Sequence, residues 1–358
     1  MKKFNTQKIM KKNTSRRDFI RTTLLTGAGL GLANSLTSLY GDSNAPAGKR
    51  VGLIGLDTSH VTAVTNALNN PKEGVDWDGY KVVAAYPTAG SSDLPASINR
   101  LAGFTEALRK LGVEIVNSID ELLKKVDVVL LESVDGRRHL AEALPVLKAG
   151  KRMFIDKPIA ASLADAMVIF NAAEKYNSPV FSSSSLRYNI SGTKEVAEGK
   201  LGKVLGADSY GDCSIEPTHP DLFWYGIHGI ELLYAIMGTG CKSVVRVHLD
   251  NTDMVVGTWQ DERIGSYRGR RSGRGGMGIT VFGEEGIETL NKSGGYEPLW
   301  VKVIEYFNTG IIPVSPAETL EIVAFMEAAD ESKLKGGTSV NLETIFQRAR
   351  KKTKKIRY

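Results

Sequence analysis

The stretch FIDKPIA, residues 154–160, places an acid, a lysine and a proline directly after an apolar run. This order predicts that Asp156 and Lys157 lie at the carboxyl end of a buried strand and that Pro158 turns the chain there. A lysine beside a desolvated pocket can exchange a proton with an alcohol, which makes Lys157 a candidate for acid–base catalysis. The alternative is a surface lysine whose stem packs on the protein while its ammonium group reaches water.

The elements that position this lysine follow from an alternation of patterns after Lys49. Short apolar runs such as RVGLIGL and DVVLLES predict buried parallel strands, and stretches such as HVTAVTNALNN and SLADAMVIFNAAEKYN have helical spacing. Ser162 is placed to cap the last of these helices. The alternation predicts an α/β fold with a doubly wound parallel sheet over residues 49–186, in which ligands bind at the carboxyl ends of the strands.

The pattern changes after residue 186. Runs such as SVVRVHL, MVVGTWQ and GITVFGEEG read as strands joined by short glycine or polar turns, with helices at GIHGIELLYAIMG and PAETLEIVAFMEAADESKLKGG. These features predict a C-terminal α+β domain with a largely antiparallel sheet over residues 187–358.

The leader, residues 1–47, carries SRRDFIR at positions 15–21, followed by a mild apolar segment rich in Gly and Ala. It holds eight basic and two acidic residues, which account for the whole formal charge of +6, so the charge does not indicate nucleic-acid binding. The leader resembles a twin-arginine (Tat) signal peptide, which predicts cleavage after APA at 45–47, the Tat translocation machinery as partner and a periplasmic protein that folds before export. A retained membrane anchor and a soluble basic N-terminus are the alternatives.

Metal and disulfide chemistry receive little support from the sequence. Cys213 and Cys241 are too few for a disulfide framework and are expected to be unpaired thiols. The segment EPTHPDLFWYGIH, residues 216–228, concentrates residue types that bind divalent cations, but its spacing matches no established metal motif. We therefore predict no metal site.

The turn after the first strand, GLIGLDTSH at residues 52–60, departs from the Gly-x-Gly-x-x-Gly pattern that brings backbone close to a pyrophosphate. Gly55 fills the first position, while Asp57 and His60 replace the second and third glycines. Thr58 and Ser59 can still offer hydroxyl and N–H groups to a phosphate at the helix start. Asp57 repels a phosphate unless its side chain points away, or it caps the following helix.

The run VVLLESVDGRRHLAEALPVLKAGKRMFIDKPIA, residues 128–160, resembles the Gfo/Idh/MocA family of oxidoreductases. In that family a strand ends near Thr-Pro, a His follows, and an AGKHV-like segment leads into Glu-Lys-Pro. Here Ser133 and Val134 replace Thr-Pro, His139 is present, and Asp156 replaces Glu before Lys157 and Pro158. SSLRYN at 184–189 and the helices of the second domain extend the likeness over nearly all of residues 49–340.

This resemblance implies a Rossmann-like first domain and hydride transfer between NAD or NADP and a hydroxyl carbon of a sugar or cyclitol. Lys157 would lie beside the nicotinamide and the substrate oxygen. The end of the second strand, Tyr86-Pro87-Thr88, lacks the acid that binds the adenosine ribose, so NAD, NADP and no nucleotide remain open. The cofactor-binding set implied by the family is Gly55, Asp57, Thr58, Ser59, His60, Ser133, His139, Asp156 and Lys157.

His228 is the second catalytic candidate, because the family places Asp-x-x-x-His on one helical face. The acid is missing four residues earlier, where Trp224 stands, so Asp221 or Glu231 would have to replace it. Trp224 and Tyr225 can stack on a sugar ring, and Arg187 lies where the chain passes into the substrate domain. The alternative is that His228 is a hydrogen-bonded core residue.

These observations predict an exported, NAD(P)-dependent oxidoreductase that acts on a carbohydrate or polyol and carries a tightly held nucleotide. The first alternative is cleavage of a glycoside by elimination or hydrolysis, by transient oxidation or by an acid–base pair alone. The second is a sugar-binding protein without activity on the same fold. The resemblance also implies a homo-oligomer, a dimer or tetramer, formed through the open face of the second sheet.

Overall fold

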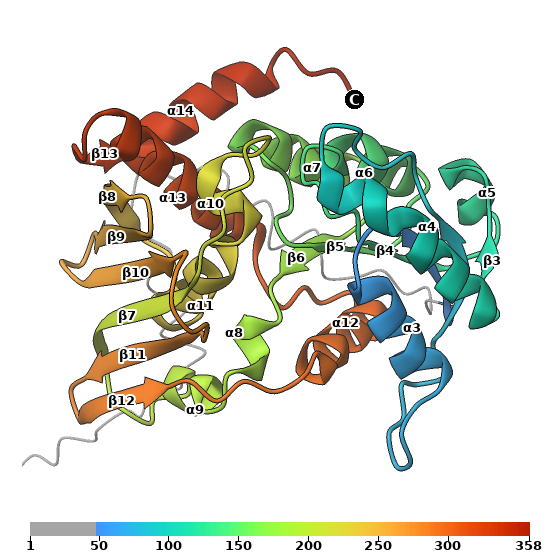
Figure 1. Ribbon diagram of the computed structural model, residues 1–358, viewed down its shortest axis with the longest axis horizontal. Helices are drawn as coiled ribbons and strands as arrows, with labels where there is room; N and C mark the ends of the chain where they lie inside the picture. Colours follow the sequence, from blue (N-terminus) through green and yellow to red (C-terminus); the bar gives the residue numbers. More distant parts are fainter. Residues whose placement is uncertain (1–47) are drawn as a thin grey trace, which may run out of the picture. The chain divides into compact units, whose positions relative to one another are not determined.

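The computed structural model describes residues 48–358 (Figure 1). The leader with its predicted Tat signal, residues 1–47, lies outside the described residues. Among the residues described, no helix combines the length and apolar character needed to cross a membrane. Cys213 and Cys241 are both free thiols, and both are buried.

The first sheet contains six parallel strands in the order β3-β2-β1-β4-β5-β6. The strand order reverses between β1 and β4, which is where doubly wound sheets bind their ligands. Its strands are β1 (Arg50–Ile54), β2 (Lys81–Tyr86), β3 (Glu114–Ile115), β4 (Val128–Leu131), β5 (Met153–Asp156) and β6 (Val180–Ser183). Its helices are α3 (His60–Asn69), α4 (Pro95–Lys110), α5 (Ile119–Leu123), α6 (His139–Lys148) and α7 (Leu163–Lys175).

Both faces of this sheet are covered, as the continuous apolar strands require. Along β1, Val51 and Leu53 pack into one core with α3 and α4, while Ile54 packs into the other with α5, α6 and α7. Ser162 caps α7 as predicted, since its hydroxyl accepts a hydrogen bond from the backbone N–H of Asp165.

The second sheet is mixed and largely antiparallel, in the order β12-β11-β7-β10-β9-β8-β13, with β7 and β10 as its parallel pair. Its strands are β7 (Val204–Asp212), β8 (Cys241–Leu249), β9 (Thr252–Trp259), β10 (Ile264–Arg270), β11 (Gly278–Gly283), β12 (Gly286–Leu290) and β13 (Val340–Asn341). The remaining helices are α8 (Leu186–Asn189), α9 (Thr193–Ala197), α10 (Asp221–Trp224), α11 (Ile227–Met237), α12 (Glu297–Thr309), α13 (Pro316–Leu334) and α14 (Leu342–Thr353). The predicted fold class is confirmed.

Helix α12 departs from the predicted division at residue 186. Its buried residues, among them Leu299, Trp300 and Phe307, belong to the same core as Val51 and Leu53 of β1. Figure 1 shows α12 beside α3, although the two helices lie far apart in the sequence. The first sheet is therefore completed by a segment from the C-terminal half of the chain.

A buried arginine organises one end of the second sheet. Arg246 on β8 is fully buried and forms ion pairs with Asp221, Asp253 and Asp330, at distances of 3.0, 2.8 and 2.5 Å. Three carboxylates from separate elements thus share one guanidinium, and each would lose a partner if the charge were removed.

We predict that Arg246→Met lowers the free energy of unfolding by about 3–5 kcal/mol, because it leaves three carboxylates without their shared counter-charge. Urea denaturation followed by circular dichroism measures this change. Arg109→Met is the matched control, since Arg109 pairs with Glu106 at the surface and the loss of that pair should cost less than about 1 kcal/mol. Equal effects of the two substitutions would contradict the prediction.

Candidate functional site

A cavity of about 420 Å³ lies at the carboxyl edge of the first sheet, where segments of both predicted domains meet. Its wall combines the loop after β1, the turn after β5, the segment that follows β6 and the start of α11. The lining residues are Thr58, Ser59, His60, Arg100, Val134, Lys157, Pro158, Ser185, Leu186, Asn189, Trp224, Tyr225, His228, Met277, Ser293, Gly294, Gly295 and Tyr296.

Lys157 lines this cavity directly after β5. Its side chain is 14% exposed, and its ammonium nitrogen lies 3.6 Å from a carboxylate oxygen of Asp156. The Lys157–Pro158 peptide bond is cis. The two ring nitrogens of buried His139 lie 2.9 Å from the carbonyl oxygen of Pro158 and 2.7 Å from that of Ser133. His139 therefore ties the turn that carries Lys157 to the end of β4.

His228, near the start of α11, lines the same cavity. Its Nδ1 lies 2.7 Å from the hydroxyl oxygen of Ser184, which follows β6, and the ring of Tyr225 packs edge-on against it at 5.1 Å. Burial, followed by the charge of Lys157, holds the pKa of His228 well below its usual range, although Asp156 opposes the shift. The imidazole is therefore neutral at pH 7, and its Nε2 is the nitrogen left for a ligand.

Two residues predicted to act on substrate instead hold the loop that supports His228. Glu231 is buried, accepts a hydrogen bond from the Ser184 backbone N–H at 2.7 Å and pairs with Arg187 at 3.1 Å. Arg187 also pairs with Glu318 at 2.5 Å. Neither Arg187 nor Glu231 lines this cavity, and the predicted contact of Arg187 with substrate and the predicted catalytic role of Glu231 stay predictions. Both are committed to charges and backbone around the Ser184 turn.

Asp221 was the other predicted acidic partner of His228, and in the structure it is paired elsewhere. Its carboxylate lies 2.6 Å from the ammonium nitrogen of Lys333 and 3.0 Å from the guanidinium of Arg246. It belongs to the buried ion-pair cluster of the second sheet and does not line the cavity. His228 is paired with the Ser184 hydroxyl in place of a carboxylate.

In the loops after β1 and β4, three residues assigned to a cofactor, Gly55, Asp57 and Ser133, contact other parts of the protein instead. Gly55 has φ +81°, and a Cβ there would lie 2.1 Å from the Ser133 hydroxyl oxygen, so glycine permits close packing of two loops. The Asp57 carboxylate accepts hydrogen bonds from the Val134 backbone N–H at 2.9 Å and the Ser97 hydroxyl at 2.5 Å. The Ser133 hydroxyl donates to Glu142 at 2.7 Å. The side chains of Asp57 and Ser133 therefore turn away from the cavity, and Asp57 is not the cap of α3, whose N-cap is Ser59.

One end of the cavity is suited to an anion. Thr58 and Ser59 line it just before the start of α3, where backbone N–H groups and the helix dipole favour negative charge. Arg100 of α4 lines the same region, and its buried Nη2 has no hydrogen-bond partner among the described residues. An incoming phosphate would supply that partner.

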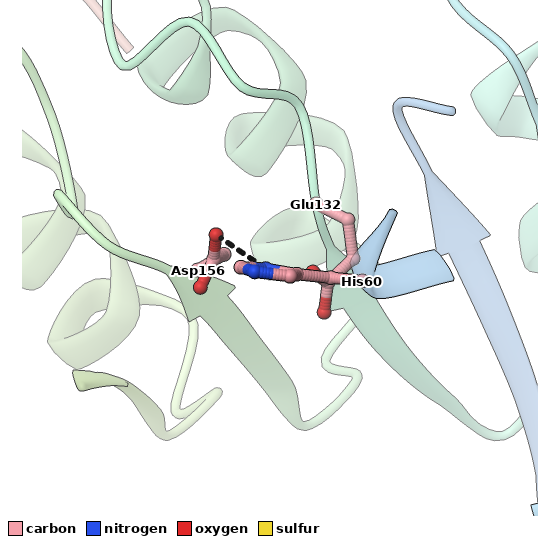
Figure 2. Close-up of side chains that lie close together, drawn as sticks. All are labelled: His60, Glu132 and Asp156. Carbon is pink, nitrogen blue, oxygen red and sulfur yellow. Dashed lines mark hydrogen bonds and ion pairs between the residues drawn. The ribbon is translucent and has the colours of Figure 1, made fainter. Parts of the chain in front are cut away.

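Beside Lys157, three side chains converge from the ends of three strands (Figure 2). His60 follows β1, Glu132 follows β4 and Asp156 ends β5. The His60 Nδ1 lies 3.1 Å from an Asp156 carboxylate oxygen and 3.7 Å from a Glu132 carboxylate oxygen. The Tyr296 ring packs edge-on against His60 at 5.0 Å.

The electrostatics of the two carboxylates differ. Burial, and then the neighbouring Asp156 carboxylate, raises the pKa of Glu132 well above its usual range, with Lys157 opposing. Burial alone would also raise the pKa of Asp156, but Lys157 and His60 outweigh it and hold that pKa below its usual range. Asp156 is therefore the more readily ionised of the two carboxylates.

Residues 49–183 match the oxidoreductase family Gfo/Idh/MocA in its NAD-binding Rossmann fold. A curated relative, the uncharacterized oxidoreductase YhhX of Escherichia coli, is 25% identical over 138 residues. That match covers 35% of this chain and 40% of YhhX, so it spans less than half of the relative's length.

Solved structures extend the similarity of fold into the second domain. A probable dehydrogenase from Thermotoga maritima superposes with a TM-score of 0.68 at 21% identity, covering 83% of this chain and 99% of the other. The myo-inositol dehydrogenase of Lactobacillus casei, solved with NAD(H) and myo-inositol, superposes with a TM-score of 0.65 at 18% identity, covering 82% and 96%. At these identities the similarity establishes the fold of both domains.

The residues that line the cavity fit the phosphates of a nicotinamide dinucleotide. Arg100 offers an unpaired buried guanidinium nitrogen, and Thr58 and Ser59 line the same cavity at the start of α3. Of the predicted cofactor set, Thr58, Ser59, His60 and Lys157 line the cavity.

Sequence reasoning missed Arg100, Glu132 and Tyr296. Arg100 looks like a solvated basic residue of a helix, and Tyr296 precedes a helix that was not predicted. A signal for Glu132 was present, because an acid that ends the apolar strand DVVLLES must lie at the same edge as Asp156.

We predict that the buried neutral state of His228 makes stability pH-dependent. A histidine whose pKa is lowered by folding binds its proton in the unfolded chain first, so stability is present above pH 6.5 and is lost as the pH falls below it. His228→Gln should therefore reduce the loss of unfolding free energy between pH 7.5 and 5.5 by up to about 1.4 kcal/mol. Lys157, Asp156 and His60 are the charged or titratable groups whose electrostatic fields act on the ring.

Urea denaturation at several pH values measures this slope for each variant. Tyr225→Phe is the control, because it alters a neighbour of the imidazole without removing a group that titrates in this range, and it should keep the wild-type slope. An unchanged slope in His228→Gln would contradict the prediction.

Proposed function

We propose that this chain is a nicotinamide-dependent oxidoreductase that acts on a carbohydrate or polyol. The observation that carries the proposal is the convergence of Lys157 from the Rossmann domain and His228 from the second domain on one cavity. The anion-binding end of that cavity, at Arg100, supports a nucleotide in the same space.

The wall contributed by the second domain favours a ring-shaped polar substrate. Trp224 and Tyr225 line the cavity beside His228, and flat aromatic faces suit the apolar face of a sugar or cyclitol. The myo-inositol in the complex of the Lactobacillus casei dehydrogenase is a compound of this class. Substrates of this type offer a secondary hydroxyl that can be oxidised to a ketone.

In this proposal the residues of the chain orient the substrate and move its proton. A bound nicotinamide would accept a hydride from the carbon that carries the reacting hydroxyl, or return it. Lys157 exchanges the proton of that oxygen, because its ammonium nitrogen is held at the cavity wall by Asp156. His228, with Nδ1 engaged by Ser184, presents Nε2 as a hydrogen-bond partner for a neighbouring hydroxyl.

Export belongs to the same proposal and is supported by the twin-arginine leader at residues 15–21. The periplasm supplies little free nicotinamide nucleotide, so an exported enzyme would fold around its nucleotide in the cytoplasm. It would then recycle that nucleotide within one site, oxidising one substrate and reducing another.

A homo-oligomer is also proposed. Exposed apolar side chains occur on four strands of the second sheet: Leu205, Val247, Leu249, Ile264 and Ile287. Apolar side chains of this kind are often covered by a second copy of a chain. Light scattering coupled to gel filtration measures the mass in solution, and a monomer would contradict this part of the proposal.

The test begins with protein purified from the cytoplasm without added nucleotide. We expect mass spectrometry of the denatured protein to detect NAD(H) or NADP(H), and a panel of inositols and glycosides to reduce or oxidise it. Lys157→Met should lower kcat/KM by about 10²- to 10⁴-fold, because it removes the group that exchanges the proton. Methionine matches the length of lysine and should preserve the fold.

Lys148→Met is the control, since Lys148 is exposed at the end of α6 in the same domain and should keep full activity. Circular dichroism of both variants checks folding. A wild-type protein that releases no nicotinamide nucleotide and binds neither NADH nor NADPH would overturn the proposal, as would an active Lys157→Met variant.

A further inference from the structure

We propose that His60, Glu132 and Asp156 bind one divalent transition-metal cation of the Mn²⁺ or Zn²⁺ type beside the cavity, which His60 lines. One imidazole and two carboxylates are ligand types that both ions accept. The three side chains come from the ends of adjacent parallel strands and point toward one another (Figure 2). This inference does not depend on the proposed oxidoreductase function.

The spacing of the ligand atoms suits a cation between them. Ligands at about 2.1 Å from a metal lie about 3.0 Å apart in octahedral and about 3.4 Å apart in tetrahedral geometry. The His60 Nδ1 lies 3.1 Å from the Asp156 oxygen and 3.7 Å from the Glu132 oxygen, and the three ligand atoms all lie within 4.8 Å of one another. Small rotations of the side chains would close these distances around an ion.

The second observation is the state of Glu132. Its side chain is fully buried, and neither carboxylate oxygen has a hydrogen-bond partner among the described residues. A carboxylate buried without partners is costly, so a position of this kind needs a counter-ion or a ligand. The His60 ring is the basic group that it faces, at 3.7 Å, and a cation between them would satisfy both.

The residues around His60 and Asp156 hold these two side chains in place. The side chain of Asp156 is 7% exposed, and its carboxylate lies 3.1 Å from the His60 Nδ1 and 3.6 Å from the Lys157 ammonium nitrogen. The Tyr296 ring packs against His60 and fixes the plane of the imidazole. Because residue 60 is the third position of the dinucleotide turn, the histidine that departs from the glycine pattern is the one that supplies the nitrogen ligand.

Three protein ligands leave coordination positions free, and His60 and Lys157 both line the cavity. The free positions would therefore accept oxygens of a small polar ligand, such as two neighbouring hydroxyls or a hydroxyl and a carbonyl of a sugar. A cation here would hold such oxygens close to the Lys157 ammonium group.

The test measures binding of the metal alone. The full chain is treated with EDTA, dialysed, and titrated with Mn²⁺ by electron paramagnetic resonance and with Zn²⁺ by calorimetry. We expect one ion per chain, with a dissociation constant in the micromolar range or below for at least one of the two metals. Glu132→Gln and His60→Gln should each weaken binding at least tenfold, because each removes a ligand while keeping nearly the same volume.

His228→Gln is the matched control, since it lines the same cavity but lies outside the three-residue cluster, and it should retain the ion. The ion should also raise the melting temperature of the wild-type protein and not that of Glu132→Gln.

Failure of the wild-type protein to bind either metal stoichiometrically, or retention of full affinity in Glu132→Gln, would overturn the inference. In that case Glu132 is a protonated buried acid. Nucleotide release and NADH binding are separate measurements, so the oxidoreductase proposal and the metal site can fail independently.

Discussion

The register of four neighbouring parallel strands is the constraint on which the site depends. Ile54 of β1 pairs with Leu131 of β4, Leu131 pairs with Ile155 of β5, and Asp156 pairs with Ser183 of β6. The strands therefore end in step, and the residues that follow them emerge side by side. A shift of one residue in any strand would turn its last side chain to the opposite face. Fully buried apolar runs on both faces prevent such a shift.

Buried polar contacts link the second domain to this edge, in addition to the shared apolar cores. The Ser184 hydroxyl contacts His228, and the Asp135 carboxylate lies 3.0 Å from the Nε2 of His219. Glu231 holds the backbone of Ser184 from the opposite side. Buried polar groups are costly when unpaired, so these contacts are directional and fix the relative placement of the cavity walls. A residue predicted from the sequence to be catalytic, Glu231, thus contributes by positioning others.

The sequence was informative where local pattern decides structure. The apolar runs and helical spacings identified the parallel sheet, and the position of Lys157 after a buried strand placed it at the correct edge. The hydrogen-bond partners of Asp57, Arg187 and Asp221 could not be predicted from the sequence, because each side chain binds a residue that is distant in the sequence. The spacing between residues cannot reveal that an acid from one loop will bind a backbone N–H of another.

The convergence of His60, Glu132 and Asp156 escaped a motif-based search for a related reason. Metal motifs are recognised when ligands share a helix or a short loop, whereas these three residues are spread over almost a hundred positions and meet through sheet topology. The segment EPTHPDLFWYGIH, which did look like a ligand cluster, is dispersed by the fold. His219 contacts Asp135, and Asp221 contacts Arg246.

Helix α12 has a consequence for how the molecule is made. The apolar face of the first sheet that holds Val51 and Leu53 is completed by Leu299, Trp300 and Phe307. During synthesis, α12 is therefore translated only after most of the chain, so this apolar face of the first sheet is completed late. A fragment that stops after β6 lacks these side chains, so we expect it to expose part of this apolar face to water.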